Sequence, residues 1–367
     1  MSFDVIRDSL GDNRSNLYPL TSYLVCGTSM SSSVHNSLLV VKLGNILPLE
    51  EDEEELEEEE EDNSQEPTLS VAKIDHWGCV NRIRVANLQG RQIAATWSEQ
   101  GQVHLWNLQH HLAAVDDGPA ADYNTKPLFS FSGHGEEGYA LSWSSLVPGK
   151  LASGGNDSRI FVWSITEEGW KVCTTPLSGH QSSVEDIQWS PNEQNVIASC
   201  SSDHTVKVWD VRNLSKPPAL DIAAHDTDVN VISWNKKQTH YLLSGGDDGV
   251  VKIWDFRYIK DKTPAIQINY HKRAITSVEW HPTDDPCFAV ASEDNTVTHW
   301  DLSLEPEEEE DEDIPRFLLF EHGGQSEIKE LHWHPQMPEV VITTAMDGFN
   351  FYRANNDPEE KEEDNEE

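Results

Sequence analysis

The sequence predicts an all-β protein: a seven-bladed propeller, in which four-stranded sheets form a closed ring. The first observation is a repeat, because a His, a Trp, an Asp and a second Trp recur in this order four times, 45 or 46 residues apart. The second is the run of β-branched and aromatic residues that ends each copy, as at 206–209 and 250–254. The third is length, since seven such units account for roughly 340 residues.

A period of about 40 to 45 residues with Gly-His and Trp-Asp pairs is typical of the WD repeat, whose unit is one propeller blade. Within each copy, polar residues stand inside otherwise apolar runs. Buried polar groups need hydrogen-bond partners, so we predict that the His, the Asp and the indole N–H of each copy form one buried chain. The residues expected to have this structural role are His134, Asp157, Trp163, His180, Asp203, Trp209, His225, Asp248, Trp254, His271, Asp294 and Trp300.

Three weaker copies bring the number of blades to seven. They lie at 20–43, 76–106 and 322–352, and each lacks at least one of the repeated residues. A ring must also protect the open edge of its last sheet, since an unpaired edge strand invites aggregation. We therefore predict that the strand-like run at 2–7 pairs with the last blade and closes the ring.

The formal net charge of −39 is unevenly distributed. Acidic residues fill 12 of 13 positions at 50–62, 8 of 9 at 305–313 and 8 of 11 at 357–367, together 28 of the 65 in the chain. Runs of like charge cannot bury enough apolar surface to fold, so we predict that all three are disordered. The expected organisation is a closing strand with its connection at 1–16, a propeller at 17–356 that contains two acidic insertions, and an acidic tail.

The acidic runs have two interpretations, as solubilising segments or as a binding surface for a very basic partner. Three runs on one small ring, two of them inside loops, exceed what solubility requires, so we favour the basic partner. The same charge would repel a nucleic-acid backbone, and we expect no direct nucleic-acid binding. The contacts that we expect within the runs are Glu53, Glu57, Glu60, Glu308 and Asp311.

A second set of candidate contacts comes from the innermost strand of each blade. Residues that flank its buried apolar position alternate away from the core, toward the rim of the central channel. The residues nominated in this way for partner binding are Tyr139, Glu185, Asp228, Asn230 and Lys329.

The sequence contains no recognisable catalytic constellation. It has no phosphate-binding glycine loop and no nucleophile elbow, and five of its sixteen histidines, His134, His180, His225, His271 and His322, are repeat residues. His332 and His334 alternate on one strand, but no third metal ligand stands at a recognisable spacing. The five cysteines form no C-x-x-C pair, and no apolar run reaches the ~20 residues of a membrane span. We expect a soluble, intracellular, non-enzymatic protein with no cofactor, metal or membrane contact.

Four segments are more specific than the repeat itself: 3–14 (FDVIRDSLGDNR), 97–103 (WSEQGQV), 183–191 (SVEDIQWSP) and 330–335 (ELHWHP). With them and its glutamate tract, the chain resembles the glutamate-rich WD-repeat-containing proteins over almost its whole length. That family is similar to the retinoblastoma-binding histone chaperones. The resemblance implies a monomeric chaperone of the nucleus and nucleolus, with a cytoplasmic pool. It also implies a role in ribosome biogenesis as the escort of a basic large-subunit ribosomal protein, L-three.

Two other functions remain open. One is a histone-binding chaperone in chromatin assembly. The other is a substrate receptor of a cullin ubiquitin ligase, because two blade ends match the W-D-x-R pattern that such receptors present to the ligase adaptor. The pattern also fits an ordinary blade end. Its residues here are Trp209, Asp210, Arg212, Trp254, Asp255 and Arg257.

Overall fold

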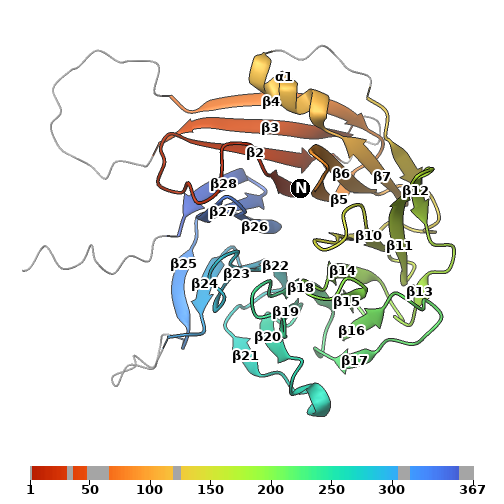
Figure 1. The fold of residues 1–367 in the computed structure, drawn as a ribbon. Coiled ribbons are helices and arrows are strands. Elements are labelled where there is room, and N and C mark those ends of the chain that lie inside the picture. The colour runs from red at the N-terminus through yellow and green to blue at the C-terminus, as the bar shows by residue number, and fades with distance from the viewer. Residues whose placement is uncertain (1, 31–35, 48–65, 119–124, 305–314, 355–367) are drawn as a thin grey trace, which may run out of the picture.

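The computed structural model describes residues 2–30, 36–47, 66–118, 125–304 and 315–354, which form a ring of seven antiparallel sheets (Figure 1). The prediction of a seven-bladed WD-repeat propeller is confirmed. The three acidic runs, and with them Glu53, Glu57, Glu60, Glu308 and Asp311, lie outside the described residues.

Within each blade the strands are given from the central channel outward, which is also their order along the chain. Blade 1 comprises β1 (Phe3–Ile6), β2 (Leu20–Gly27), β3 (Asn36–Ile46) and β4 (Thr68–His76). Blade 2 comprises β5 (Val80–Leu88), β6 (Arg91–Ser98), β7 (Gln102–Asn107) and β8 (Phe129–Phe131). Blade 3 comprises β9 (Ala140–Trp143), β10 (Leu151–Gly154) and β11 (Arg159–Thr166), with β12 (Gly169–Val172) and β13 (Leu177–Ser178) both paired to β11.

The remaining blades continue the ring. Blade 4 comprises β14 (Val184–Trp189), β15 (Val196–Ser201), β16 (Thr205–Asp210) and β17 (Leu220–Ala223). Blade 5 comprises β18 (Val229–Trp234), β19 (Tyr241–Gly246), β20 (Val250–Asp255) and β21 (Ile266–Asn269). Blade 6 comprises β22 (Ile275–Trp280), β23 (Cys287–Ser292), β24 (Val297–Asp301) and β25 (Leu318–His322). Blade 7 has three described strands, β26 (Glu330–His334), β27 (Met337–Ala345) and β28 (Gly348–Arg353).

The strand predicted at 2–7 exists, but the prediction that it pairs with the last blade is wrong. β1 pairs with β2, so that Phe3 lies opposite Cys26, and it is the innermost strand of blade 1. Burial explains this place. Phe3, Val5 and Ile6 are all buried, whereas an outer strand would expose one face. Blade 7 and blade 1 meet instead through a shared core and through hydrogen bonds of residues 2–14 to blade 7.

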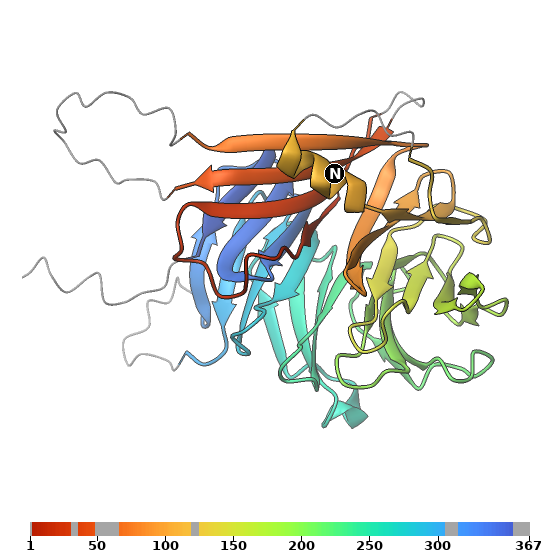
Figure 2. The ribbon, with the colours of Figure 1, turned by 45° about the horizontal axis from the view of Figure 1, so that its top comes forward.

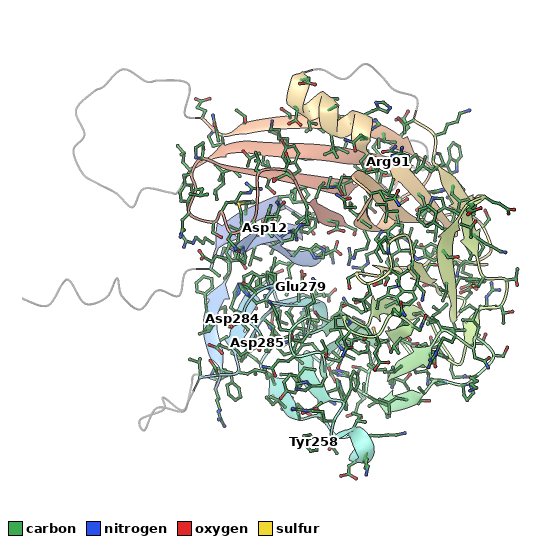
Figure 3. The ribbon with its side chains drawn as sticks, viewed as in Figure 1. Asp12, Arg91, Tyr258, Glu279, Asp284 and Asp285 are labelled. Carbon is green, nitrogen blue, oxygen red and sulfur yellow. The ribbon has the colours of Figure 1, made fainter. Side chains whose placement is uncertain are left out.

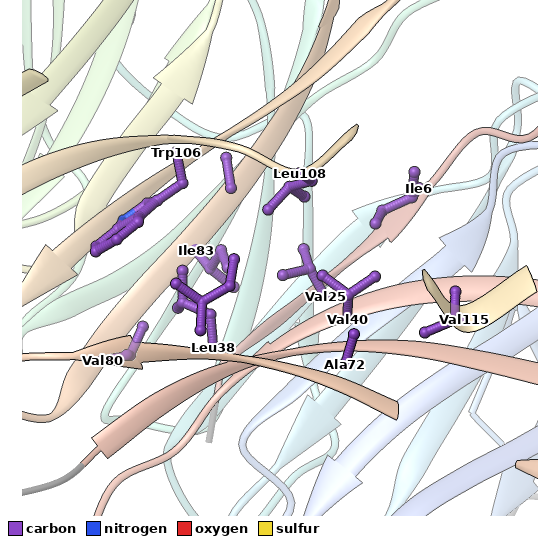
Figure 4. Packing of buried hydrophobic residues seen from close by; sticks show 12 residues of the cluster. Ile6, Val25, Leu38, Val40, Ala72, Val80, Ile83, Trp106, Leu108 and Val115 are labelled. Atoms are coloured by element: carbon purple, nitrogen blue, oxygen red, sulfur yellow. The ribbon is translucent and has the colours of Figure 1, made fainter. Parts of the chain in front are cut away.

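Apolar clusters lie between neighbouring blades and hold the ring together. Between blades 1 and 2, Leu38 and Ile74 pack against Val80 and Ile83 (Figure 4). The α1 helix (Gln109–Asp117) adds Val115 to this cluster and lies across β3 and β4, as Figure 2 shows. A short 3₁₀ helix, η2 (Ile259–Asp261), follows β20. Among the described residues, no helix has the length and apolarity that crossing a bilayer requires.

Candidate functional site: the mouth of the central channel

The repeat residues form one hydrogen-bonded chain inside each of four blades. In blade 4, His180 Nδ1 lies 2.9 Å from an Asp203 carboxylate oxygen, and its Nε2 lies 2.7 Å from Ser199 Oγ. The indole of Trp209 donates to the same Ser199 Oγ at 2.9 Å. Burial alone would raise the pKa of Asp203, but the hydrogen bonds from His180, Thr205 and the Gln181 backbone together outweigh it and hold that pKa below its usual range.

Blades 3, 5 and 6 repeat this geometry. The His to Asp distances are 3.2 Å for His134, 3.0 Å for His225 and 2.9 Å for His271. The hydroxyl groups that complete the chains belong to Ser153, Ser244 and Thr298. Sequence reasoning missed these hydroxyls, although in blades 3, 4 and 5 a Ser stands ten residues before the second Trp. The histidines of these hydrogen-bonded chains therefore have a structural role.

Polar side chains of the innermost strands join each blade to the next. Asp186 accepts a hydrogen bond from the backbone N–H of Ile232 at 3.1 Å, and Asp4 accepts one from Val85 at 2.6 Å. Burial raises the pKa of both carboxyl groups, and nearby arginines only partly offset it. These carboxylates line the channel, but their oxygens already accept hydrogen bonds that join neighbouring blades.

Deeper in the channel, charged side chains form a buried cluster that surrounds Glu330. Its Oε1 lies 2.9 Å from an Arg82 nitrogen and 2.8 Å from an Arg84 nitrogen. On its other side, His332 Nδ1 lies 3.0 Å from Glu279, whose label in Figure 3 marks the channel side of blade 6. Burial would raise the pKa of Glu330, but Arg84 and Arg82 hold it well below the usual range. The cluster borders a cavity of about 230 Å³ inside the channel.

Bulges direct polar side chains to the mouth of the channel. In β14 the register with β15 shifts between Val184 and Asp186, which leaves Glu185 as the extra residue. The same shift leaves Asn230 as the extra residue of β18, and β5 and β22 have shifts at equivalent places. A β-bulge re-aims the side chain of its extra residue. Glu185 and Asn230 accordingly line the mouth.

The mouth is a depression of about 730 Å³. Four of the five rim residues nominated from the sequence line it together: Tyr139, Glu185, Asn230 and Lys329. Asp228 lies outside this lining, with its carboxylate 3.6 Å from His204 Nε2.

The mouth carries charges of both signs. Glu185 and Asp247 lie on the side of blades 4 and 5, where they accept hydrogen bonds from Ser202 and from Asn230. Lys272 and Arg273, which precede β22, line the same depression together with Lys329 and Glu293. The sequence gives no signal for the place of the Lys272–Arg273 pair at the mouth. A ligand of a single charge would meet both signs here, so the pattern discriminates among basic segments.

The two W-D-x-R blade ends lie at the other end of the strands from the mouth, since Asp210 pairs with Val196 at the start of β15. Arg212 contacts Asp210 at 2.5 Å, and Arg257 contacts Asp255 at 2.6 Å. Arg212 is 72% exposed, so this side chain is accessible despite its ion pair. In the part of the chain that the structure describes, no three His, Cys, Asp or Glu residues group as metal ligands would.

Comparison with known proteins agrees with this architecture. The family described as WD domain, G-beta repeat matches residues 125–164, 171–210, 217–255 and 262–301. Protein HEAT STRESS TOLERANT DWD 1 of Arabidopsis thaliana is 44% identical over 96% of this chain and 83% of its own length. Ribosome assembly protein rrb1 of Schizosaccharomyces pombe is 40% identical over 96% of this chain and 77% of its own length. Glutamate-rich WD repeat-containing protein 1 of Dictyostelium discoideum is 44% identical over 98% of this chain and 78% of its own length. Because these matches span most of both chains, the protein belongs to the family of glutamate-rich WD repeat-containing proteins.

Proposed function

We propose that this protein is a non-enzymatic WD-repeat chaperone in ribosome biogenesis, and that it escorts the basic large-subunit ribosomal protein L-three. A relative that is 40% identical over most of this chain is named a ribosome assembly protein, which supports the assignment to this process. The single observation that carries the escort role is the charge distribution. Three runs hold 28 of the 65 acidic residues, on a ring that otherwise has mixed charge.

The acidic runs and the mouth of the channel contribute to client binding in different ways. A ribosomal protein that must later bind RNA presents Lys and Arg surfaces, which collect stray nucleic acid while the protein is free. Acidic runs shield such surfaces without requiring a fixed geometry, and they speed encounter through a field that salt screens over about 8 to 10 Å. The mouth of the channel supplies the fixed contacts. There Glu185 and Asp247 bind cations of the client, Tyr139 offers an aromatic surface, and Lys272 with Arg273 rejects segments whose charges are wrongly spaced.

A role without catalysis fits how the ionisable groups are used. The repeat histidines of blades 3 to 6, His134, His180, His225 and His271, are each held by an Asp and by a Ser or Thr partner. The channel carboxylates of Asp4, Asp186 and Glu330 accept backbone N–H groups of neighbouring blades. We further propose that the protein acts as a monomer in the nucleus and nucleolus, with a cytoplasmic pool where newly made client is first met.

The test is a mixture of the full chain with purified ribosomal protein L-three and bulk RNA at ~0.15 M salt. We expect the client to stay soluble and free of RNA. Replacing 50–62 and 305–313 with uncharged Gly-Ser segments of equal length should slow association far more than it speeds dissociation. The control is a variant that keeps both acidic runs and instead replaces the loop 213–218, which contains no acidic residue, with a Gly-Ser segment of equal length. If the charge-free variant associates at the wild-type rate, the escort proposal fails.

A further inference from the structure

A groove of about 510 Å³ lies between blades 4 and 5, at the end of the strands where the W-D-x-R residues stand, away from the mouth. Tyr258, labelled in Figure 3, and the η2 helix mark this end of blade 5. Inside the groove, the rings of Trp234 and Phe256 meet edge to face with centroids 5.4 Å apart. Several apolar side chains line it and remain only partly buried: Val196, Val208, Leu220, Phe256 and Ile259. The groove therefore presents an apolar surface that the described chain does not fully cover.

Hydrogen bonds fix the walls of this groove. The side-chain amide of Asn192 in blade 4 donates to Thr239 Oγ1 in blade 5 at 2.8 Å, which joins the two walls. The indole N–H of Trp234 donates to the backbone carbonyl of Thr239 at 2.8 Å. His240 also lines the groove, and its buried Nε2 has no hydrogen-bond partner among the described residues. The walls are thus preorganised, and one polar atom in them is left for a ligand.

Basic residues surround the groove, although the chain as a whole carries a net charge of −39. Four loops border it, at 190–195, 211–219, 235–240 and 256–265, and each contributes to its lining. Together they contain two acidic residues, Glu193 and Asp261, and seven basic ones: Arg212, Lys216, Lys236, Lys237, Arg257, Lys260 and Lys262. The local charge is therefore opposite in sign to that of the whole protein.

Most of this positive charge is free. The two arginines pair with Asp210 and Asp255 at the ends of their own strands. The five lysines are all exposed, and no carboxylate of the described residues forms an ion pair with any of them. Lys260 directly follows Ile259, which lines the groove. These lysines are consequently available to an anionic ligand.

Neither the apolar lining nor the basic loops follow from the blade architecture alone. The loop 235–240 of blade 5 has two lysines and no acidic residue, whereas the corresponding loop of blade 6, 281–286, has two acidic residues and no basic one. Val208 lines the groove between blades 4 and 5, and His299 takes its place in the equivalent groove between blades 6 and 7. The combination is particular to blades 4 and 5.

We propose that this groove binds an acidic segment of a second partner protein, distinct from the basic client. A Leu or Phe side chain of the segment enters between Leu220 and Phe256, and Asp or Glu residues on either side face Lys237 and Lys260. The long, flexible stems of the lysines follow the carboxylates without a fixed geometry. The apolar lining favours a peptide over nucleic acid, whose phosphates are bound by charge and need no such groove. A basic segment is repelled here, so the two partners occupy opposite ends of the strands.

The first test titrates the full chain at ~0.15 M salt with a fluorescent peptide whose core reads Glu-Asp-Leu-Phe-Asp-Glu. One control peptide replaces Leu and Phe with Ser and keeps the charge. A second replaces the acidic residues with Lys and keeps the apolar pair. We expect each control to bind at least about tenfold more weakly. Equal binding of the Ser peptide would show that the surface attracts anions without using the groove, and would overturn the proposal.

Matched variants test the groove and the lysines separately. Ala219 lines the groove, and Ala265 is its counterpart in blade 5, because each is exposed and donates its backbone N–H at 2.7 Å to the third strand of its blade. Ala219→Glu should weaken binding of the acidic peptide at least about tenfold, and Ala265→Glu by less than about twofold.

The double variant Lys260→Glu with Lys262→Glu should also lose binding. Lys126→Glu with Lys171→Glu makes the same change in net charge at two exposed lysines of blades 2 and 3 and should retain it. Melting curves show that the variants fold. Equal affinities within either pair would overturn the proposal.

Crosslinking locates the bound peptide. With a benzophenone in place of its Phe, crosslinks should fall at 219–220 and 256–259, and crosslinks at the mouth would contradict the proposal. An RNA oligonucleotide that displaces the peptide at lower concentration would assign the surface to nucleic acid. A peptide of residues 50–62 that competes as well as the probe would assign the groove to the protein's own segment, and either result overturns the proposal. Capture of L-three should be unchanged in Ala219→Glu, so failure here leaves the escort function standing.

Discussion

Glu330 of the last blade accepts a hydrogen bond from the backbone N–H of Phe3 in the first blade, at 3.0 Å. The same carboxylate accepts a hydrogen bond from Ser2 Oγ at 2.7 Å and forms ion pairs with Arg82 and Arg84 of blade 2. One buried side chain therefore links three consecutive blades at the point where the two ends of the ring meet. In the part of the chain that the structure describes, this polar cluster on the channel wall and the apolar core shared by blades 7 and 1 join the two ends of the ring.

Replacing Glu330 with Gln should destabilise the fold by about 3 to 5 kcal/mol, because two arginines would be left in the channel without their carboxylate. Chemical denaturation measures this change. Glu327→Gln, which removes a mostly exposed carboxylate from the loop before β26, should change stability by less than about 1 kcal/mol. Equal stability of the two variants would show that the Glu330 cluster does not close the ring.

The stability of the protein should depend on the protonation of His332. Burial opposes its charged form, but Glu279 and Glu330 outweigh burial and raise its pKa from 6.5 to about 9. The folded state thus holds this proton more tightly than the unfolded state. The resulting stabilisation is complete below about pH 6.5 and is lost as the pH rises toward 9.

The check is the difference in unfolding free energy between the wild type and His332→Gln, which cannot titrate. That difference should shrink as the pH rises through this window. A difference that stays constant or grows would mean that His332 is neutral in the folded protein.

The Asp of a repeat chain should matter for stability and leave binding intact. Asp203→Ala removes the partner of His180 Nδ1, whose side chain is fully buried, at a cost of about 1 to 3 kcal/mol. Asp226→Ala alters an exposed residue of the following loop and is the control. Thermal melting and client capture are measured on both. Loss of capture in an Asp203→Ala protein of normal stability would assign this residue to the binding site instead.

Charge reversal at Glu185 and at Asp228 should affect client association differently, although the sequence nominated both residues for partner binding. Glu185→Lys reverses a charge in the lining and should slow association of ribosomal protein L-three several-fold, without unfolding the ring. Asp228→Lys reverses a charge that lies outside the lining, next to His204, and should have a smaller effect. Stopped-flow association rates at low and moderate salt measure both. Equal rates for both variants and the wild type would remove the mouth from client recognition.

Much of this structure could be predicted because the same sequence pattern recurs along the chain and specifies the same local structure each time. The spacing of Trp163, Trp209 and Trp254 predicts consecutive blades of the ring. The partner of β1 could not be predicted, since its strand pattern does not encode which sheet it joins. That choice depends on Glu330, more than 300 residues away in the chain.

The candidate site was harder to predict than the fold. Alternation along the strands found Glu185 and Asn230, but it does not reveal the bulges that turn them toward the mouth. It also placed Asp228 at the rim, where the backbone instead directs it to His204. Lys272 and Arg273 carry no pattern of their own, and only the folded ring places them in the same depression as Glu185.

The most direct measurement of the central claim is capture of endogenous partners from cell extract by the full chain at moderate salt, followed by mass spectrometry. The account predicts that ribosomal protein L-three is retained, that it is free of ribosomal RNA, and that replacement of the acidic runs reduces its capture. Retention of core histones without any ribosomal protein would contradict the account in favour of a histone chaperone, and retention of a cullin ligase adaptor through the W-D-x-R ends would contradict it in favour of a substrate receptor.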